Sequence, residues 1–246
     1  MVPGMLAPLL NQVKRSPPGS SLVIFDLDST LYDLTQRVTA ILKRFTLDPE
    51  VCAKFPEACA RLQNVKIHRT DWGLVEPLSR VGITNSSHDE FVREVHAAWA
   101  AGFFSNDFLD RDFPLPGAVE FVRACLERGA EILYLTGRDV PRMGAGTQTS
   151  LREWGFPLEH PKVNLVLKPT KELDDAQFKA DVIDALVHRY DHVWLFENEP
   201  VNINVVLKRT PKVKVVFVDT CHSGLEVVTN PFASVEHFDF SISDLE

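Results

Sequence analysis

The chain has 246 residues, of which 45% are apolar and 24% charged. A chain of this size and composition buries a core without disulfides or structural metal, which excludes coiled-coil, collagen-like and disordered classes. The net charge of −8 argues against a surface built mainly to bind nucleic acid, but it is compatible with a local pocket for a small anion. There is no CxxC pair, signal peptide or bilayer-length apolar run, so we expect a reduced, cytoplasmic protein without membrane contact.

Five apolar runs rich in β-branched residues predict the strands of a buried parallel sheet. They cover residues 22–25, 132–135, 163–167, 193–196 and 213–218. Helical patterns lie between them at 116–129 and 179–188, where apolar residues recur every three or four positions. Strands that alternate with helices predict βαβ units and therefore an α/β fold with a mostly parallel, right-handed sheet.

The stretch between the first two strands is too long for a simple crossover. It contains no convincing strand but carries helical stripes, for example Val38, Ile41, Leu42 and Phe45. We therefore predict an α/β core made of residues 1–33 and 114–246. Residues 34–113 are expected to form a helical insert above the carboxyl edge of the sheet.

Polar residues stand directly after three of the predicted strands, where an open α/β sheet binds its ligands. In chain order they are Asp26, Asp28, Ser29 and Thr30 after the first strand, Thr136, Gly137 and Arg138 after the second, and Glu197, Asn198 and Glu199 after the fourth. Lys179 is expected to begin the helix that leads into the fourth strand. Carboxylates, a hydroxyl and a cation are thus predicted to converge on one edge of the sheet.

The acidic residues of this set fit a magnesium site. Two carboxylates two residues apart repel each other unless a cation lies between them or one of them is protonated. Mg²⁺ prefers oxygen ligands of this kind, so Asp26, Asp28 and Glu197 are the candidate metal ligands. Mg²⁺ and Lys179 together would neutralise a bound phosphoryl group.

The same residues form a candidate catalytic set for phosphoryl transfer. Asp26 is the candidate nucleophile, which would attack phosphorus and form an aspartyl-phosphate. Asp28 is the candidate general acid and base, first for the leaving oxygen and then for the hydrolytic water. Thr136 and Lys179 complete the catalytic set. The candidate contacts of the phosphoryl group are Thr136, Gly137, Arg138 and Lys179.

Two of these motifs resemble those of the haloacid dehalogenase (HAD) superfamily. The sequence FDLDST, residues 25–30, resembles the first motif DxDxT, and LTGRD, residues 135–139, resembles the second. The resemblance implies a Rossmann-like core with a helical C1-type cap at residues 34–113, and Mg²⁺-dependent hydrolysis of a small phosphomonoester. It also implies that Asp26 is the nucleophile, that Asp28 is the acid/base, and that the backbone carbonyl of Asp28 binds the metal.

The sequence departs from the superfamily pattern at the later motifs. Glu197 and Glu199 stand where Asp is usual, and either is a candidate metal ligand. Lys168 and Lys179 are both candidates for the motif lysine, with Lys179 favoured because one helix, a turn and a strand fit between it and Glu197. Arg138 is expected to contact either a phosphate or its neighbour Asp139.

Two alternative functions follow from weaker features. The pattern F-K…F-E-N, formed by residues 178–179 and 196–198, together with LTGR also resembles an RNA-repair branch of the superfamily, which would make the chain a polynucleotide-end phosphatase. That function predicts that the basic patch of Lys208, Arg209, Lys212 and Lys214 lies beside the active edge. The glutamates in place of aspartate suggest a weakly active or inactive binding protein of the same fold. Trp72 is expected to pack inside the helical insert, with a place in a substrate pocket as the alternative.

Overall fold

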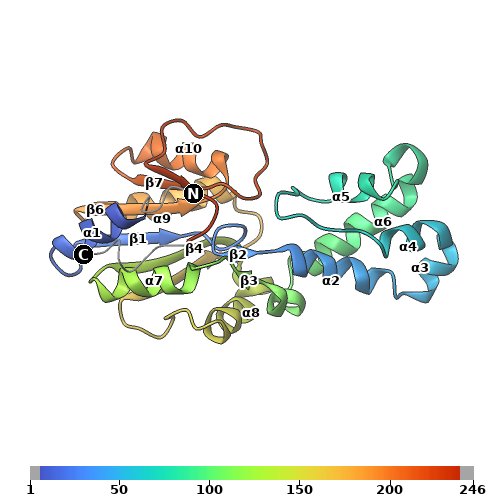
Figure 1. Ribbon diagram of the computed structural model, residues 1–246, viewed down its shortest axis with the longest axis horizontal. Helices are drawn as coiled ribbons and strands as arrows, with labels where there is room; N and C mark the ends of the chain where they lie inside the picture. Colours follow the sequence, from blue (N-terminus) through green and yellow to red (C-terminus); the bar gives the residue numbers. More distant parts are fainter. Residues whose placement is uncertain (1–5, 239–246) are drawn as a thin grey trace.

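A six-stranded parallel sheet forms the centre of the computed structural model, which describes residues 6–238 (Figure 1). The strand order is β5-β4-β1-β6-β7-β8, and every neighbouring pair is parallel. The strands are β1 (Ser21–Phe25), β4 (Glu131–Asp139), β5 (Val163–Lys168), β6 (His192–Glu197), β7 (Lys214–Val218) and β8 (Ala233–Val235). The predicted α/β fold with a Rossmann-like parallel-sheet core is confirmed. The short strand β8 was not predicted.

Helices cover both faces of the sheet (Figure 1). On one face lie α1 (Ala7–Arg15), α7 (Ala118–Glu127) and α8 (Val140–Glu153), and on the other α9 (Asp175–Val187) and α10 (Pro200–Arg209). Successive residues of β1 serve the two faces, because Val23 and Phe25 pack in the first cluster while Leu22 and Ile24 pack in the second. Burial on both faces explains why the strands read as continuous apolar runs.

The structure corrects the start of two predicted helices. Helix α7 begins at Ala118, because the preceding Gly117 has a φ of 75°, in the left-handed region. Helix α9 begins at Asp175, where the Asp174 carboxylate accepts a hydrogen bond of 2.9 Å from the backbone N–H of Gln177. Lys179 therefore lies inside α9, one turn after its start, rather than at its first residue.

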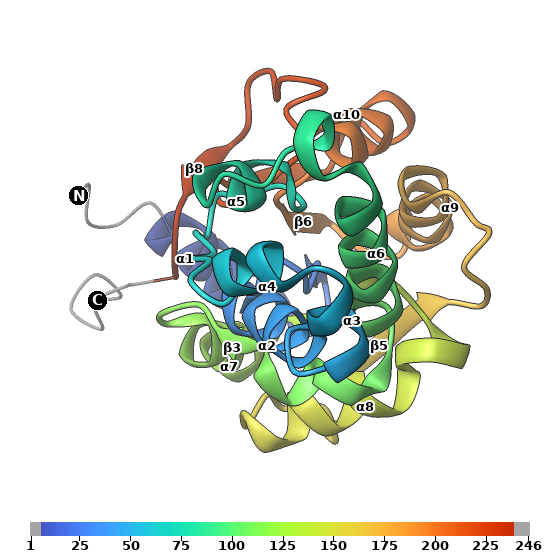
Figure 2. The same ribbon diagram turned by 90° about the vertical axis from the view of Figure 1, so that its right-hand side faces the viewer.

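Most of the helices between β1 and β4 lie in one stretch of chain, which we call the helical segment (residues 34–113). It contains α2 (Thr35–Phe45), α3 (Pro49–Lys54), α4 (Pro56–Leu62), α5 (Val75–Arg80), α6 (Asn85–Phe103) and the 3₁₀ helix η1 (Asn106–Arg111). Helices α2 to α6 contribute to an apolar cluster of their own, which includes Leu42, Phe91 and Val95, whereas η1 contributes no residue to it. Figure 2 shows them in front of one end of the sheet. Neither α6, the longest helix with 19 residues, nor any other helix within residues 6–238 is apolar enough to span a membrane.

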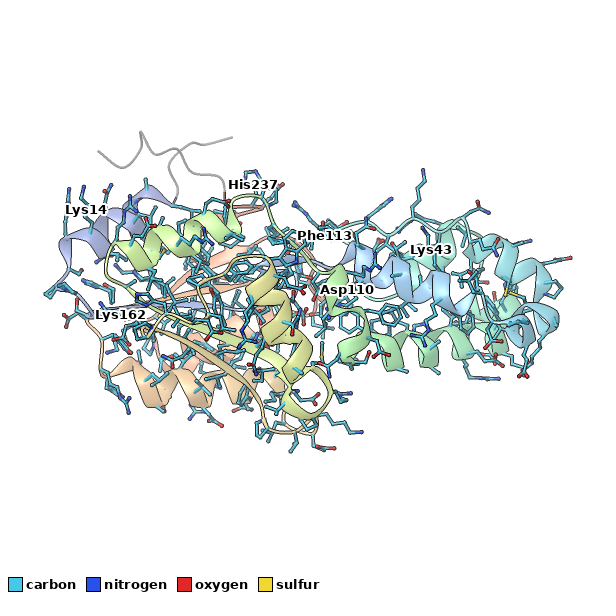
Figure 3. The ribbon with its side chains drawn as sticks, turned by 90° about the horizontal axis from the view of Figure 1, so that it is seen from below. Lys14, Lys43, Asp110, Phe113, Lys162 and His237 are labelled. Carbon is cyan, nitrogen blue, oxygen red and sulfur yellow. The ribbon has the colours of Figure 1, made fainter. Side chains whose placement is uncertain are left out.

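The chain enters and leaves the helical segment at neighbouring positions. Strands β2 (Tyr32–Asp33) and β3 (Phe113–Pro114) form an antiparallel ladder in which Tyr32 pairs with Pro114 and Asp33 with Phe113. The N–H of Leu115 donates to the carbonyl of Leu31 at 2.8 Å, which extends this pairing. Figure 3 shows Phe113 at the junction between the sheet core and the helical segment. Both connections therefore belong to one small two-stranded element.

Candidate active site

A cavity of about 500 Å³ lies between the carboxyl edge of the sheet and the helical segment. Asp26, Thr136 and Glu197 line it from the ends of β1, β4 and β6. Aromatic side chains of α6, including Trp99 and Phe103, line it from the helical segment. This is the edge where the sequence predicted the polar residues to converge.

Asp26, Lys179 and Glu197 form a buried ionic cluster in this cavity. The Lys179 ammonium donates to Asp26 Oδ1 at 2.7 Å and to Glu197 Oε2 at 2.6 Å. Burial, with a further contribution from Glu197, raises the pKa of Asp26 to about 7 even though Lys179 opposes this shift. Burial alone would lower the pKa of Lys179, but the two carboxylates outweigh it and raise that pKa above its ordinary value. One cation thus faces two carboxylates, and the cluster carries excess negative charge.

The strand pairing explains why these residues meet. Phe25 and Phe196 are partners in the β1–β6 ladder, so the residues that follow them lie next to each other. The backbone N–H of Asp26 donates to the carbonyl of Phe196 at 3.0 Å. Lys179 reaches the cluster because it shares the buried face of α9 with Ala176, Ala180 and Ile183.

The two remaining candidates of the later motifs have other partners. Lys168 donates to the carbonyl of Leu173 at 2.9 Å and forms an ion pair with Asp175. Glu199 accepts from the backbone N–H of Val201 at 3.3 Å and from that of Ser223 at 2.9 Å, and so caps α10. The structure therefore places Lys179 and Glu197, rather than Lys168 and Glu199, beside Asp26.

Asp28 is held by two buried arginines. Arg138 binds it through two contacts, Nη2 to Oδ1 at 2.6 Å and Nε to Oδ2 at 3.1 Å, and Arg37 Nη2 lies 2.7 Å from Oδ1. Both guanidinium groups also pair with the buried carboxylate of Asp112, at 2.7 Å from Arg138 and 3.1 Å from Arg37. Burial raises the pKa of Asp28, but the two arginines outweigh burial and hold that pKa well below its ordinary value. In this arrangement Asp28 is ionised.

Arg37 and Asp112 were missed by sequence reasoning. Arg37 belongs to the same helical face as Ile41. A charged side chain on an otherwise apolar stripe needs a buried partner, and this pattern could have indicated Arg37 from the sequence. Nothing local marks Asp112, which stands far along the chain just before β3. Of the two contacts expected for Arg138, the pairing with Asp139 is not formed, because Asp139 instead binds Arg142, with Oδ2 2.6 Å from Nε.

Thr136 and Gly137 lie at the irregular end of β4. Thr136 is fully buried, and its hydroxyl oxygen accepts a hydrogen bond of 3.2 Å from the backbone N–H of Arg138. Its hydroxyl hydrogen remains available to a ligand in the cavity. A Cβ atom at Gly137 would overlap the carboxylate of Asp175, so the Asp175 side chain, which pairs with Lys168, would have to move to admit any other residue here.

The loop before α5 places Trp72 on the cavity wall. The Asp71 carboxylate accepts from the backbone N–H of His68 at 2.7 Å and from Arg80 Nη1 at 2.9 Å, which fixes the loop. Cys221 of the core donates its thiol to the carbonyl of Asp71 at 2.9 Å. Trp72 lines the cavity and is 52% exposed, so the expectation that it packs inside the helical segment is wrong.

Solved structures with the same fold match this chain over about nine tenths of its length. A structure from Clostridium difficile assigned as a phosphatase matches with a TM-score of 0.57 and 14% identity, over 90% of this chain and 96% of that chain. A HAD-superfamily hydrolase of subfamily IA from Geobacter sulfurreducens matches with a TM-score of 0.53 and 12% identity, over 91% and 95% of the two chains. The chain has the HAD fold. No protein-family model and no curated protein matches the sequence.

The HAD fold does not by itself specify the reaction. Protein tyrosine kinase A (PtkA) of Mycobacterium tuberculosis matches with a TM-score of 0.52 and 17% identity, over 94% of this chain and 97% of that chain. Proteins named as a hydrolase and as a kinase are thus about equally similar to this chain. The activity has to be argued from the site residues.

The basic patch lies near the amino end of β7, on the side of the sheet away from the carboxyl edge that lines the cavity. Lys214 begins β7, which runs parallel to β6, whereas Glu197 ends β6 at the cavity. The Lys214 ammonium donates to Gln12 of α1 at 2.7 Å, and Arg209 forms ion pairs with Asp181 and Asp184 of α9. The placement beside the active edge that a polynucleotide-end phosphatase predicts is therefore not observed.

Proposed function

We propose that this chain is a phosphatase that hydrolyses a small phosphomonoester through an aspartyl-phosphate on Asp26. One observation carries the proposal: Asp26 lies at a sheet edge inside a covered cavity, in direct contact with a lysine that also binds Glu197. A carboxylate nucleophile for phosphorus needs nearby positive charge and little bulk water. The cavity supplies both conditions.

The proposed reaction has two steps. In the first, an Asp26 oxygen bonds to phosphorus while the ester bond breaks, and the leaving oxygen takes a proton from Asp28. In the second, water attacks phosphorus, Asp28 accepts a proton from that water, and the bond between phosphorus and Asp26 breaks to release phosphate. The Thr136 hydroxyl donates to a phosphoryl oxygen, and Lys179 stabilises negative charge on the transferring group.

The residues at this edge fit a bound Mg²⁺. Within residues 6–238, no three His, Cys, Asp or Glu side chains lie close enough together to hold a metal by themselves. Mg²⁺ commonly binds through only one or two carboxylates, waters and substrate phosphate. Asp26 and Glu197 provide these carboxylates, and their excess negative charge favours a second cation. Asp28 would contribute its backbone carbonyl, because its carboxylate is bound to two arginines.

When bound, Mg²⁺ would neutralise charge on the phosphoryl oxygens and on the Asp26 carboxylate. The protein residues would orient the reacting groups and exclude water. Lys179 would orient Asp26, and Arg37 and Arg138 would orient Asp28 for proton transfer. The helical segment would exclude bulk water from the cavity.

The ionised state of Asp28 suits its proposed role as the base in the second step better than its proposed role as the acid in the first. A carboxylate is the form that accepts a proton from water, so Asp28 is in the form that the second step requires, although the two arginines also make it a weaker base. The first step requires Asp28 to carry a proton in contact with two guanidinium groups that oppose protonation. A leaving group that departs as a stable anion avoids this demand, so aryl phosphates are convenient first substrates.

Hydrolysis of p-nitrophenyl phosphate with Mg²⁺ tests the proposed function. We expect turnover by the natural chain and a loss of at least about a thousandfold in Asp26→Asn, which keeps the size of the side chain but removes the nucleophile. Phe232→Ala, on an exposed aromatic residue outside the cavity, is the matched control and should retain turnover. Absence of turnover on a broad panel of phosphate esters would instead support a binding protein of the HAD fold.

A further inference from the structure

The wall of the cavity opposite Asp26 is built mainly from aromatic and apolar side chains. Trp99, Phe103 and Phe104 come from the end of α6, Ile67 and Trp72 from the loop before α5, and Leu225 from the loop after β7. Trp99 and Phe103 have ring centroids 5.0 Å apart with planes inclined by 37°. A cavity of about 500 Å³ is within the range of roughly 300–1,000 Å³ found for sites that bury small molecules.

Trp72 and Leu225 leave large apolar surfaces open at this wall. Trp72 is 52% exposed and Leu225 is 81% exposed, although apolar side chains of this size are stabilised by burial. Trp72 stands next to Asp71, which three hydrogen bonds hold in place, so its loop is fixed. A ligand that covers the indole ring would bury apolar surface that is exposed in the free protein, and this burial would stabilise the complex.

The charged residues of the cavity disfavour a second anionic group on the ligand. Among the described lining residues, Arg69, Arg138 and Lys179 are the lysines and arginines. Arg138 and Lys179 are already paired with Asp28, Asp26 and Glu197, and Arg69 lies 3.7 Å from Glu236. The other charged lining residues are acidic, namely Asp33, Asp71, Asp174, Asp175 and Glu199. A second phosphate would therefore meet more carboxylates than cations in this lining.

We infer that the substrate is a monophosphate ester whose leaving group carries a flat, uncharged aromatic ring, as a nucleoside monophosphate does, and that this ring stacks on Trp72. The inference rests on the proposed function, because it assumes that the phosphate is bound at Asp26. Stacking is tolerant of the identity of the ring, since every nucleobase presents a π face. The α6 aromatics and Leu225 would close the apolar surface around the ring.

Three substrates with the same kind of phosphate ester test this inference. They are adenosine 5′-monophosphate, ribose 5-phosphate, which lacks the ring, and adenosine 5′-diphosphate, which adds a second phosphate. We expect kcat/KM for the monophosphate to exceed that for ribose 5-phosphate by about tenfold, as stacking of one base implies. The diphosphate should be a poorer ligand than the monophosphate. Equal kcat/KM values with and without the ring would overturn the inference while leaving the phosphatase activity intact.

Variants of Trp72 locate the effect. Trp72→Ala should reduce the ratio of the two kcat/KM values about tenfold, Trp72→Phe should retain most of it, and Phe232→Ala should leave it unchanged. Binding to Asp26→Asn provides a readout without turnover: adenosine 5′-monophosphate should quench the tryptophan fluorescence of this variant, and ribose 5-phosphate should not. Ring-dependent binding without turnover in the natural chain would count against the phosphatase and support the aromatic ligand. A ratio unaffected by Trp72→Ala would show that Trp72 is not the stacking platform.

Discussion

Arg138 binds Asp28 through both of its oxygens, with Nη2 2.6 Å from Oδ1 and Nε 3.1 Å from Oδ2. A guanidinium group matches a carboxylate in this paired geometry, and a lysine ammonium does not. Because Arg138 lies near the end of the strand that carries Thr136, the orientation of Asp28 is tied to the sheet core. Arg37 adds a contact from the helical segment, so the sheet core and the helical segment hold the same carboxylate.

Arg138→Lys tests whether this paired contact positions Asp28. We expect kcat to fall by about ten- to a hundredfold with little change in KM, because the charge remains while the fixed orientation is lost. Steady-state kinetics with p-nitrophenyl phosphate measures both values, and circular dichroism checks the fold. Arg138→Leu should behave differently and destabilise the protein by about 3–5 kcal/mol, since it leaves Asp112 and Asp28 short of a buried counter-ion. Equal kcat values for Arg138→Lys and the natural chain would rule out a positioning role.

Asp28→Asn should separate the two steps of the reaction. Nitrophenolate departs without a proton, so phosphorylation of Asp26 should still occur, whereas removal of the phosphate loses its base. Rapid mixing with p-nitrophenyl phosphate should release about one nitrophenolate per protein chain in a burst, followed by turnover slowed by about 10² to 10⁴. A slow reaction without a burst would assign Asp28 to the first step instead.

Mg²⁺ should stabilise the folded protein through Asp26 and Glu197. Ligand binding to the native state raises the melting temperature, so added Mg²⁺ should raise it in the natural chain and EDTA should abolish turnover. Glu197→Gln should lose most of the thermal response to Mg²⁺. Glu199→Gln is the matched control, because Glu199 caps α10 and lies outside the ionic cluster, and it should keep the response. The opposite pattern would identify Glu199 as the ligand.

Asp139 should stabilise α8 in a pH-dependent way. Its carboxylate accepts from the backbone N–H of Arg142 at 3.0 Å and pairs with the guanidinium, and these contacts outweigh burial and lower its pKa. A lowered pKa means that the stabilisation is complete above the ordinary carboxyl pKa of about 4 and is lost as the pH falls below it. Asp139→Ala should cost about 1–2 kcal/mol at neutral pH in urea denaturation, and the difference should shrink in acid. A difference that is constant across this pH range would contradict the role of the charge.

The parts of the site that the sequence predicted are those tied to strand ends. Asp26, Thr136 and Glu197 each follow a continuous apolar run, so their common edge follows from parallel pairing. The choice between Lys168 and Lys179 required the phase of α9, because only the buried face of that helix points to the sheet. The sequence spacing favoured Lys179 and left Lys168 as the alternative, and the structure separates them through their partners.

The network around Asp28 could not be predicted in the same way. Arg37 lies near the start of the helical segment and Asp112 near its end. The two residues meet because β2 and β3 bring the two ends of this segment together. Periodicity describes one element at a time and contains no information about such a meeting. The position of Trp72 was missed for a related reason, since a loop residue has no periodic pattern that distinguishes a cavity wall from a packed interior.

The ladder of β2 and β3 makes the helical segment a removable module. Its entry and exit are paired residues, so a tight turn joining Tyr32 to Pro114 would close the chain with the parallel sheet unchanged. Such a truncated protein would lose Arg37, Asp112 and the aromatic wall, but it would keep Asp26, Lys179 and Glu197 together. Evolution or design can therefore exchange the selectivity of this protein by replacing one continuous stretch of the chain, while the residues proposed to transfer phosphate stay where the sheet holds them.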